Sequence, residues 1–136
     1  MHFSYEVKIP KSTSQAAPYV KDLQISAGFI TGMQIIIPAG HAGTAHLVLK
    51  YHEFQVYPLS RDEDYHGDGV PLVWRDQFDL GSGPFELKAE GWNTDTHSDH
   101  RFQVHIEIMR AEQLGINTGT VTLKDLIGIV GTELEV

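Results

Sequence analysis

Short runs of alternating apolar and polar residues, separated by turn-forming residues, fill most of this chain and constrain its fold more than any other feature. The run over 101–109 is typical, because Phe102, Val104, Ile106 and Ile108 fall at every second position. A period of two places one set of side chains on one face of an extended strand. Strands recur roughly every 8 to 12 residues, which is typical of an antiparallel sandwich or barrel. They are predicted over 3–9, 19–25, 29–37, 44–51, 52–57, 70–80, 85–92 and 101–109.

The predicted fold class is all-β: an antiparallel jelly-roll β-sandwich of about eight strands, with an extended N-terminal strand and a C-terminal arm. A chain of 136 residues with 41% hydrophobic content suffices to bury one core, and the absence of cysteine leaves packing to stabilise it. We expect an N-terminal strand and connector over 1–18, the sandwich over 19–110 and the arm over 111–136. The core is predicted to contain Ile35, Ile37, Val104, Ile106 and Ile108.

Both ends of the chain carry apolar side chains that suit contacts with another chain. The first strand places its apolar residues on one side and stops at Pro10. In the arm, Thr122 can cap a short helix that ends at Gly131. The arm either closes the domain's own core or docks on a partner. The predicted interface residues are Phe3, Tyr5, Val7 and Ile9 in the first strand and Leu123, Leu126, Ile127 and Val130 in the arm.

The charge balance excludes one large class of partners. Ten Lys and Arg residues against eighteen Asp and Glu residues give a formal net charge of −8. Because this charge opposes attraction to a phosphate backbone, nucleic-acid binding is excluded as a main function. No signal peptide is predicted, and no apolar run approaches the ~18 residues of a membrane span. We expect a chain made in the cytoplasm, soluble unless assembled, with no membrane partner.

Two polar segments have compositions that suit a cation. The first holds Asp95, His97, Asp99 and His100, and the second is the acidic loop over 62–69. The acidic loop lacks the alternating register of an EF-hand, so a solvated loop is the preferred interpretation. The group over 95–100 is likewise interpreted as a polar loop between strands. We therefore predict no metal ligands and no cofactor.

Histidines within predicted strands were compared with the cupin metal motif. His46 and Glu53 match parts of it, but Val48 occupies the position of the second histidine and the later half of the motif is absent. This mismatch argues against a cupin enzyme. We interpret His46 and His105 as solvent-facing or hydrogen-bonded strand residues.

No arrangement in the sequence indicates catalysis. There is no nucleophile elbow and no phosphate-binding glycine loop, and the glycines over 81–84 form a turn. We predict a protein that is not an enzyme and has no catalytic residue. The alternative binding hypothesis is a saccharide platform, which would use Trp74, Trp92 and the 62–69 loop. The aromatic residues considered for such a platform are Tyr51, Tyr57, Tyr65, Trp74 and Trp92.

Several segments of the chain are rich in turn residues: ISAGFIT (25–31), IIPAGHAG (36–43), FQVYP (54–58), GDGV (67–70), FEL (85–87) and WNTD (92–95). Together they resemble small β-sandwich proteins encoded among the structural genes of tailed bacteriophages and related mobile elements. The resemblance covers about residues 19–109, and it lies in turn chemistry rather than in catalytic chemistry. It implies a capsid decoration (cement) protein and transfers no catalytic residue.

On this resemblance, the expected function is to bind and stabilise a bacteriophage capsid at its surface. The expected partners are the major capsid protein and the chain itself, as a homotrimer. An N-terminal strand can add to the edge of a neighbour's sheet, and many weak copies can act together through avidity. The alternative function is a saccharide-binding or host-surface-binding module displayed on a virion.

Overall fold

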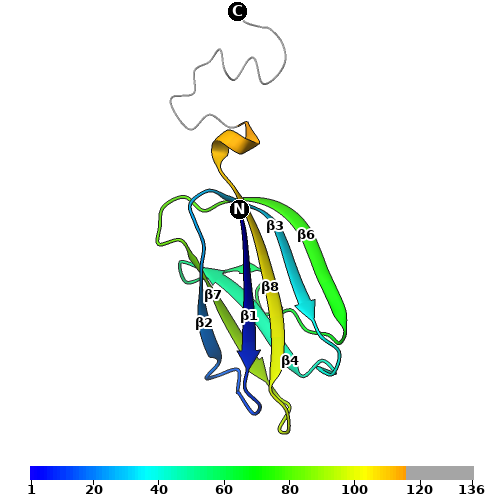
Figure 1. The fold of residues 1–136 in the computed structure, drawn as a ribbon. Coiled ribbons are helices and arrows are strands. Elements are labelled where there is room, and N and C mark those ends of the chain that lie inside the picture. The colour runs from blue at the N-terminus through cyan, green and yellow to red at the C-terminus, as the bar shows by residue number, and fades with distance from the viewer. Residues whose placement is uncertain (116–136) are drawn as a thin grey trace, which may run out of the picture.

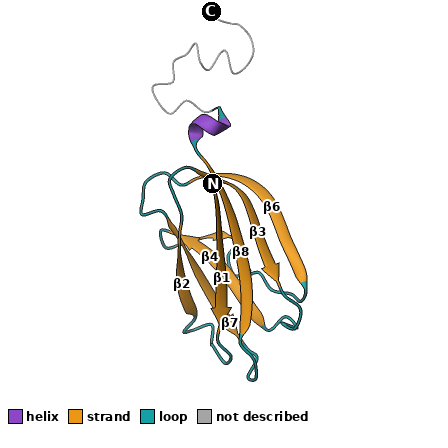
Figure 2. Cartoon of the chain, viewed as in Figure 1, coloured by secondary structure: helices purple, strands orange, loops and turns teal. Residues whose placement is uncertain are grey.

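The computed structural model describes residues 1–115, and this range is almost entirely β-structure (Figure 1). Eight strands form two four-stranded antiparallel sheets, and a short 3₁₀ helix, η1, follows the last strand (Figure 2). The predicted all-β class with about eight antiparallel strands is confirmed. The elements are β1 (His2–Ile9), β2 (Tyr19–Gln24), β3 (Phe29–Ile37), β4 (Ala45–Tyr51), β5 (Phe54–Tyr57), β6 (Val70–Asp79), β7 (Glu86–Asn93), β8 (His100–Met109) and η1 (Ala111–Leu114).

The strands pair in a nested order. The first sheet has the order β1-β8-β3-β6, and the second has the order β2-β7-β4-β5. The first strand thus pairs with the last, the second with the seventh, the third with the sixth and the fourth with the fifth. Figure 1 shows β1 in dark blue running alongside β8 in yellow, although they come from opposite ends of the sandwich sequence. Additional pairing of β3 with β8 and of β4 with β7 joins these pairs into two layers.

The hydrophobic core lies between the two sheets and takes side chains from both. The five predicted core residues, Ile35, Ile37, Val104, Ile106 and Ile108, are at most 1% exposed, which confirms that prediction. Alternation along each strand explains the result, because every second side chain points toward the opposite sheet. The second sheet contributes Leu23, Ala45, Leu47, Leu49, Leu87 and Ala89.

The N-terminal strand is part of the first sheet. β1 pairs with β8 from His2 to Ile9, so its apolar side faces the core between the sheets. Val7 and Ile9 are completely buried, and Phe3 and Tyr5 pack against the same core while partly exposed. Because these four side chains contact their own domain, an interface formed by β1 would have to use its main-chain edge or its outward side chains.

The segment after β8 begins with η1, which the sequence analysis had assigned to the arm. Ala111 in this helix is buried, and Gly115 ends the helix in a left-handed conformation with φ of 76°. The predicted helix from Thr122 and the interface residues Leu123, Leu126, Ile127 and Val130 lie outside the described residues.

Candidate functional site

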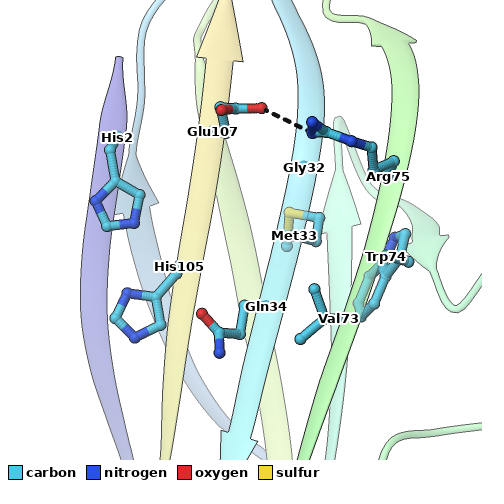
Figure 3. Close-up of a pocket in the computed structure, with 9 residues that line it drawn as sticks. All are labelled: His2, Gly32, Met33, Gln34, Val73, Trp74, Arg75, His105 and Glu107. Carbon is cyan, nitrogen blue, oxygen red and sulfur yellow. Dashed lines mark ion pairs between the residues drawn. The ribbon is translucent and has the colours of Figure 1, made fainter.

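A hollow of about 290 Å³ lies on the outer face of the first sheet and is the candidate functional site (Figure 3). All four strands of the sheet contribute to it, and their register explains which side chains meet. In one row across the sheet, His2 lies opposite Glu107, and Gly32 lies between Glu107 and Arg75. The lining residues are His2, Gly32, Met33, Gln34, Val73, Trp74, Arg75, His105 and Glu107.

The hollow exists because Gly32 places no side chain at the centre of this row. A bulge between Ile30 and Gly32 shifts the register of β3 against both neighbouring strands. It brings the Thr31 hydroxyl next to the same face, where it donates to Glu107 Oε1 at 2.7 Å. Arg75 Nη1 lies 3.6 Å from that same oxygen. One end of the hollow is therefore formed by the Glu107 carboxylate with the Arg75 guanidinium beside it, as Figure 3 shows.

One side of the hollow is formed by two parallel imidazole rings, which lie across from Val73 and Trp74 (Figure 3). His2 and His105 stack with their ring centroids 5.4 Å apart and an interplanar angle of 5°. The Ser4 hydroxyl lies 2.8 Å from His105 Nδ1, which holds that ring in place. The prediction that His105 is a hydrogen-bonded strand residue is confirmed. Flat rings, an amide, a carboxylate and a guanidinium around an open hollow suit many weak polar contacts with a ligand or a protein surface.

The aromatic residues considered for a saccharide platform are divided between the core and the two sheets. Tyr51 and Tyr57 are 6% and 5% exposed, so they belong to the core. Trp74 packs against Tyr57 and Tyr65, with ring centroids 5.5 Å and 5.3 Å away. Burial raises the pKa of Tyr65 to about 12, so its phenol stays neutral at physiological pH. Trp92 lies on the other sheet, so Trp74 and Trp92 do not share one stacking surface.

Asp95, His97 and Asp99 lie in the loop before β8 and His100 is the first residue of β8, and the four side chains do not converge on one point. Asp95 Oδ1 accepts main-chain hydrogen bonds from His97 and Ser98, and its Oδ2 lies 2.9 Å from His100 Nε2. These hydrogen bonds, with the His97 N–H as the strongest influence, lower the pKa of Asp95. Asp99 contacts Lys8 and the Lys11 main chain instead, and these contacts lower its pKa.

The structure brings together two features that the sequence analysis treated separately. His46 on β4 lies beside Asp64 and His66 from the acidic 62–69 loop, on the outer face of the second sheet. The prediction that His46 is hydrogen-bonded is confirmed, because its Nδ1 lies 2.6 Å from Asp64 Oδ1. Alternation of Asp64 and His66 about Tyr65 was the sequence signal available for this grouping.

A buried histidine pair lies at the end of the sandwich near the 95–100 loop. His41 and His100 are 2% and 7% exposed, with ring centroids 4.6 Å apart. His41 Nε2 donates to the Arg101 carbonyl at 2.9 Å, whereas its Nδ1 has no partner within the described chain. Burial, aided by the proximity of His100, lowers the pKa of His41 below its ordinary value of 6.5, although the Arg101 hydrogen bond and Asp68 act in the opposite direction.

This lowered pKa predicts that the folded protein loses stability in acid. The unfolded chain protonates His41 near pH 6.5 while the folded chain resists protonation, so the contribution of His41 is complete above that pH and falls as the pH drops through the folded pKa. One such group gives at most about 1.4 kcal/mol per pH unit. Urea unfolding at pH 7.5 and pH 5.5 measures the slope, and His41→Gln should make it shallower. His97→Gln is the control at a side chain that is 91% exposed, and an equal change in both variants would contradict the assignment.

Comparison with known proteins adds no assignment to this geometry. No family model, no curated protein and no solved structure matches the chain. Within residues 1–115, no helix is long and apolar enough to cross a membrane. The observations define a two-sheet all-β protein with a polar, open hollow on the face of its first sheet.

Proposed function

We propose that the protein is a jelly roll and acts as a non-enzymatic virion structural protein, a decoration (cement) protein on the surface of a bacteriophage capsid. The observation that carries this proposal is the nested pairing of first with last, second with seventh, third with sixth and fourth with fifth strand. One long hairpin folded over on itself gives this pairing and the two four-stranded sheets of a jelly roll. Capsid proteins and lectins are among the proteins built on that architecture.

The β1 edge of the first sheet disfavours the addition of a strand from a partner, so we expect a partner to dock on outward side chains instead. Lys21 Nζ donates to the Glu6 carbonyl of β1 at 2.7 Å, and a lysine at a sheet edge discourages pairing with a further strand. The outer face is more open to a partner, since Val73 beside the hollow is 67% exposed. The proposed partners remain the major capsid protein and two further copies of the chain. Residues 121–130 remain proposed as a second contact.

Size-exclusion chromatography with light scattering tests the proposal. We expect the purified chain to elute as a trimer and to co-elute with shells assembled from the major capsid protein encoded nearest to its gene. Simultaneous contact at many equivalent positions should make this association strong even if each contact is weak. A monomer that does not co-elute with those shells would contradict the proposal.

The second candidate function is saccharide binding, and the hollow around Gly32 favours it. Parallel imidazole rings on one side, with Gln34, Arg75 and Glu107 within reach, combine flat surfaces with hydrogen-bonding groups. A glycan array on the same preparation discriminates the two functions. A methyl group at Gly32 would lie 3.2 Å from Glu107 Oε1, so Gly32→Ala should fold, narrow the hollow at its centre and weaken any glycan signal that arises there.

A further inference from the structure

The loop between β5 and β6 pairs with β4 of the second sheet through one isolated bridge, and this bridge determines which side chains meet. Leu47 on β4 and Tyr65 form an isolated antiparallel bridge with two main-chain hydrogen bonds, of 3.0 Å and 2.9 Å. Leu47 points into the core and is fully buried. Neighbours of a bridged pair point to the opposite face of the sheet. His46, Asp64 and His66 are therefore placed together on the outer face.

These three side chains converge on one small volume. Asp64 Oδ1 lies 2.6 Å from His46 Nδ1 and 2.8 Å from His66 Nδ1. The three ligand atoms all lie within 4.8 Å of one another. The His46 ring also stacks on Trp92, its paired residue on β7, with ring centroids 5.3 Å apart and an interplanar angle of 9°. Nδ1 of His46 comes from a ring held in place by Trp92, and Asp64 Oδ1 and His66 Nδ1 come from the loop that the bridge attaches to β4. These two nitrogens and one oxygen thus face each other.

We propose that His46, Asp64 and His66 bind a divalent transition-metal ion, with Zn²⁺ as the ion that best fits this donor set. Imidazole nitrogen and carboxylate oxygen are both ordinary Zn²⁺ ligands, and three protein ligands leave a fourth position for water or another group. Two nitrogens among three donors disfavour Ca²⁺ and Mg²⁺, which take oxygen ligands. This site is separate from the hollow on the first sheet and does not depend on the proposed function.

The distances require only a small rearrangement to admit the ion. Ligand atoms about 2.1 Å from a tetrahedral Zn²⁺ are about 3.4 Å apart, so the Nδ1 to Oδ1 distances, now 2.6 Å and 2.8 Å, must lengthen by about 0.6 to 0.8 Å. The His66 side chain, which is 52% exposed, is free to make this adjustment, whereas those of His46 and Asp64 are 20% and 17% exposed. Both histidines bind as neutral rings with the proton on Nε2.

The surroundings favour a cation. Asp64 also lines a hollow of about 190 Å³ in which Asp62, Glu63 and Glu90 supply further carboxylates. Lys50 lies in the same hollow and pairs with Glu90 at 3.1 Å, so it offsets part of that charge. Several carboxylates in one hollow, on a chain with a formal charge of −8, raise the local concentration of cations.

Zn²⁺ titration of the full chain by calorimetry tests the site, with Co²⁺ absorption as a probe of tetrahedral coordination. We expect one ion per chain, and His66→Ala and Asp64→Asn should each weaken binding at least tenfold. His97→Ala is the matched control, because it removes an exposed histidine outside the cluster and should leave the affinity unchanged.

Circular dichroism of each variant separates a lost ligand from a lost fold, and His66→Ala should remain folded because that side chain is half exposed. NMR of the imidazole nitrogens adds a readout at the site itself, since Zn²⁺ should shift Nδ1 of His46 and His66. Absence of binding at one equivalent of Zn²⁺, equal weakening by His97→Ala, or binding of Ca²⁺ in place of Zn²⁺ would each overturn the proposal.

Discussion

Truncation of Phe102 to alanine is expected to lower the free energy of unfolding by about 3 to 5 kcal/mol. Phe102 is fully buried on β8, which lies between β1 and β3 in the first sheet. Its ring also meets the edge of His41, with centroids 5.0 Å apart and an interplanar angle of 89°. Removal of the ring therefore leaves a cavity under β8, which is held by a neighbour on each side, so collapse of β8 around it is restricted. Urea unfolding at pH 7.5 measures the loss.

The neighbouring side chain on the same strand provides the control for Phe102→Ala. Gln103 points to the outer face of the sheet and is exposed, so Gln103→Ala should change stability by less than about 0.5 kcal/mol. A loss below about 1 kcal/mol for Phe102→Ala would show that the core between β8 and the second sheet is looser than the buried areas imply.

Local patterns were sufficient to predict the strands, because the alternation that predicts a strand is the same alternation that buries one of its faces. Phe29 to Ile37 was predicted with the bounds that the structure has. Partner choice is different, since nothing in the pattern of β1 indicates that it pairs with β8 at the far end of the sequence. For this reason the sequence analysis could assign Val7 and Ile9 to an interface although their side chains complete the core.

The two sites depend on irregular backbone that periodicity does not describe. The hollow requires the bulge next to Gly32, which moves Thr31 and Glu107 into contact across the strands. The histidine and aspartate cluster requires one bridge between Tyr65 in a loop and Leu47 in a strand. Each feature is a long-range pairing event, so the alternation of Asp64 and His66 was visible in the sequence while their contact with His46 was not.

A glycine within a strand is one signal that the sequence did carry, and it leads to the second large expected effect. Gly91 on β7 lies directly beneath Ile9 of the opposite sheet. A methyl group at this position would overlap Ile9 Cδ1 and would lie only 2.9 Å from both Ile9 Cγ1 and the His46 carbonyl oxygen. Gly91→Ala is therefore expected to cost about 1 to 3 kcal/mol through overpacking, measured by urea unfolding.

A double-mutant cycle assigns this cost to the contact between the sheets. Ile9→Val removes Cδ1 and should cost about 0.5 to 1.5 kcal/mol alone. Combined with Gly91→Ala, it should relieve the overlap, so that the double variant loses at least about 1 kcal/mol less than the two single losses together. Ile9 pairs with the first residue of β8, and Ile108 lies near the other end of that strand. Ile108→Val is therefore the matched control, and its loss of stability should add to that of Gly91→Ala within about 0.5 kcal/mol. Simple additivity of Ile9→Val with Gly91→Ala would instead place the strain at the two atoms that Ile9→Val retains, Ile9 Cγ1 and the His46 carbonyl oxygen.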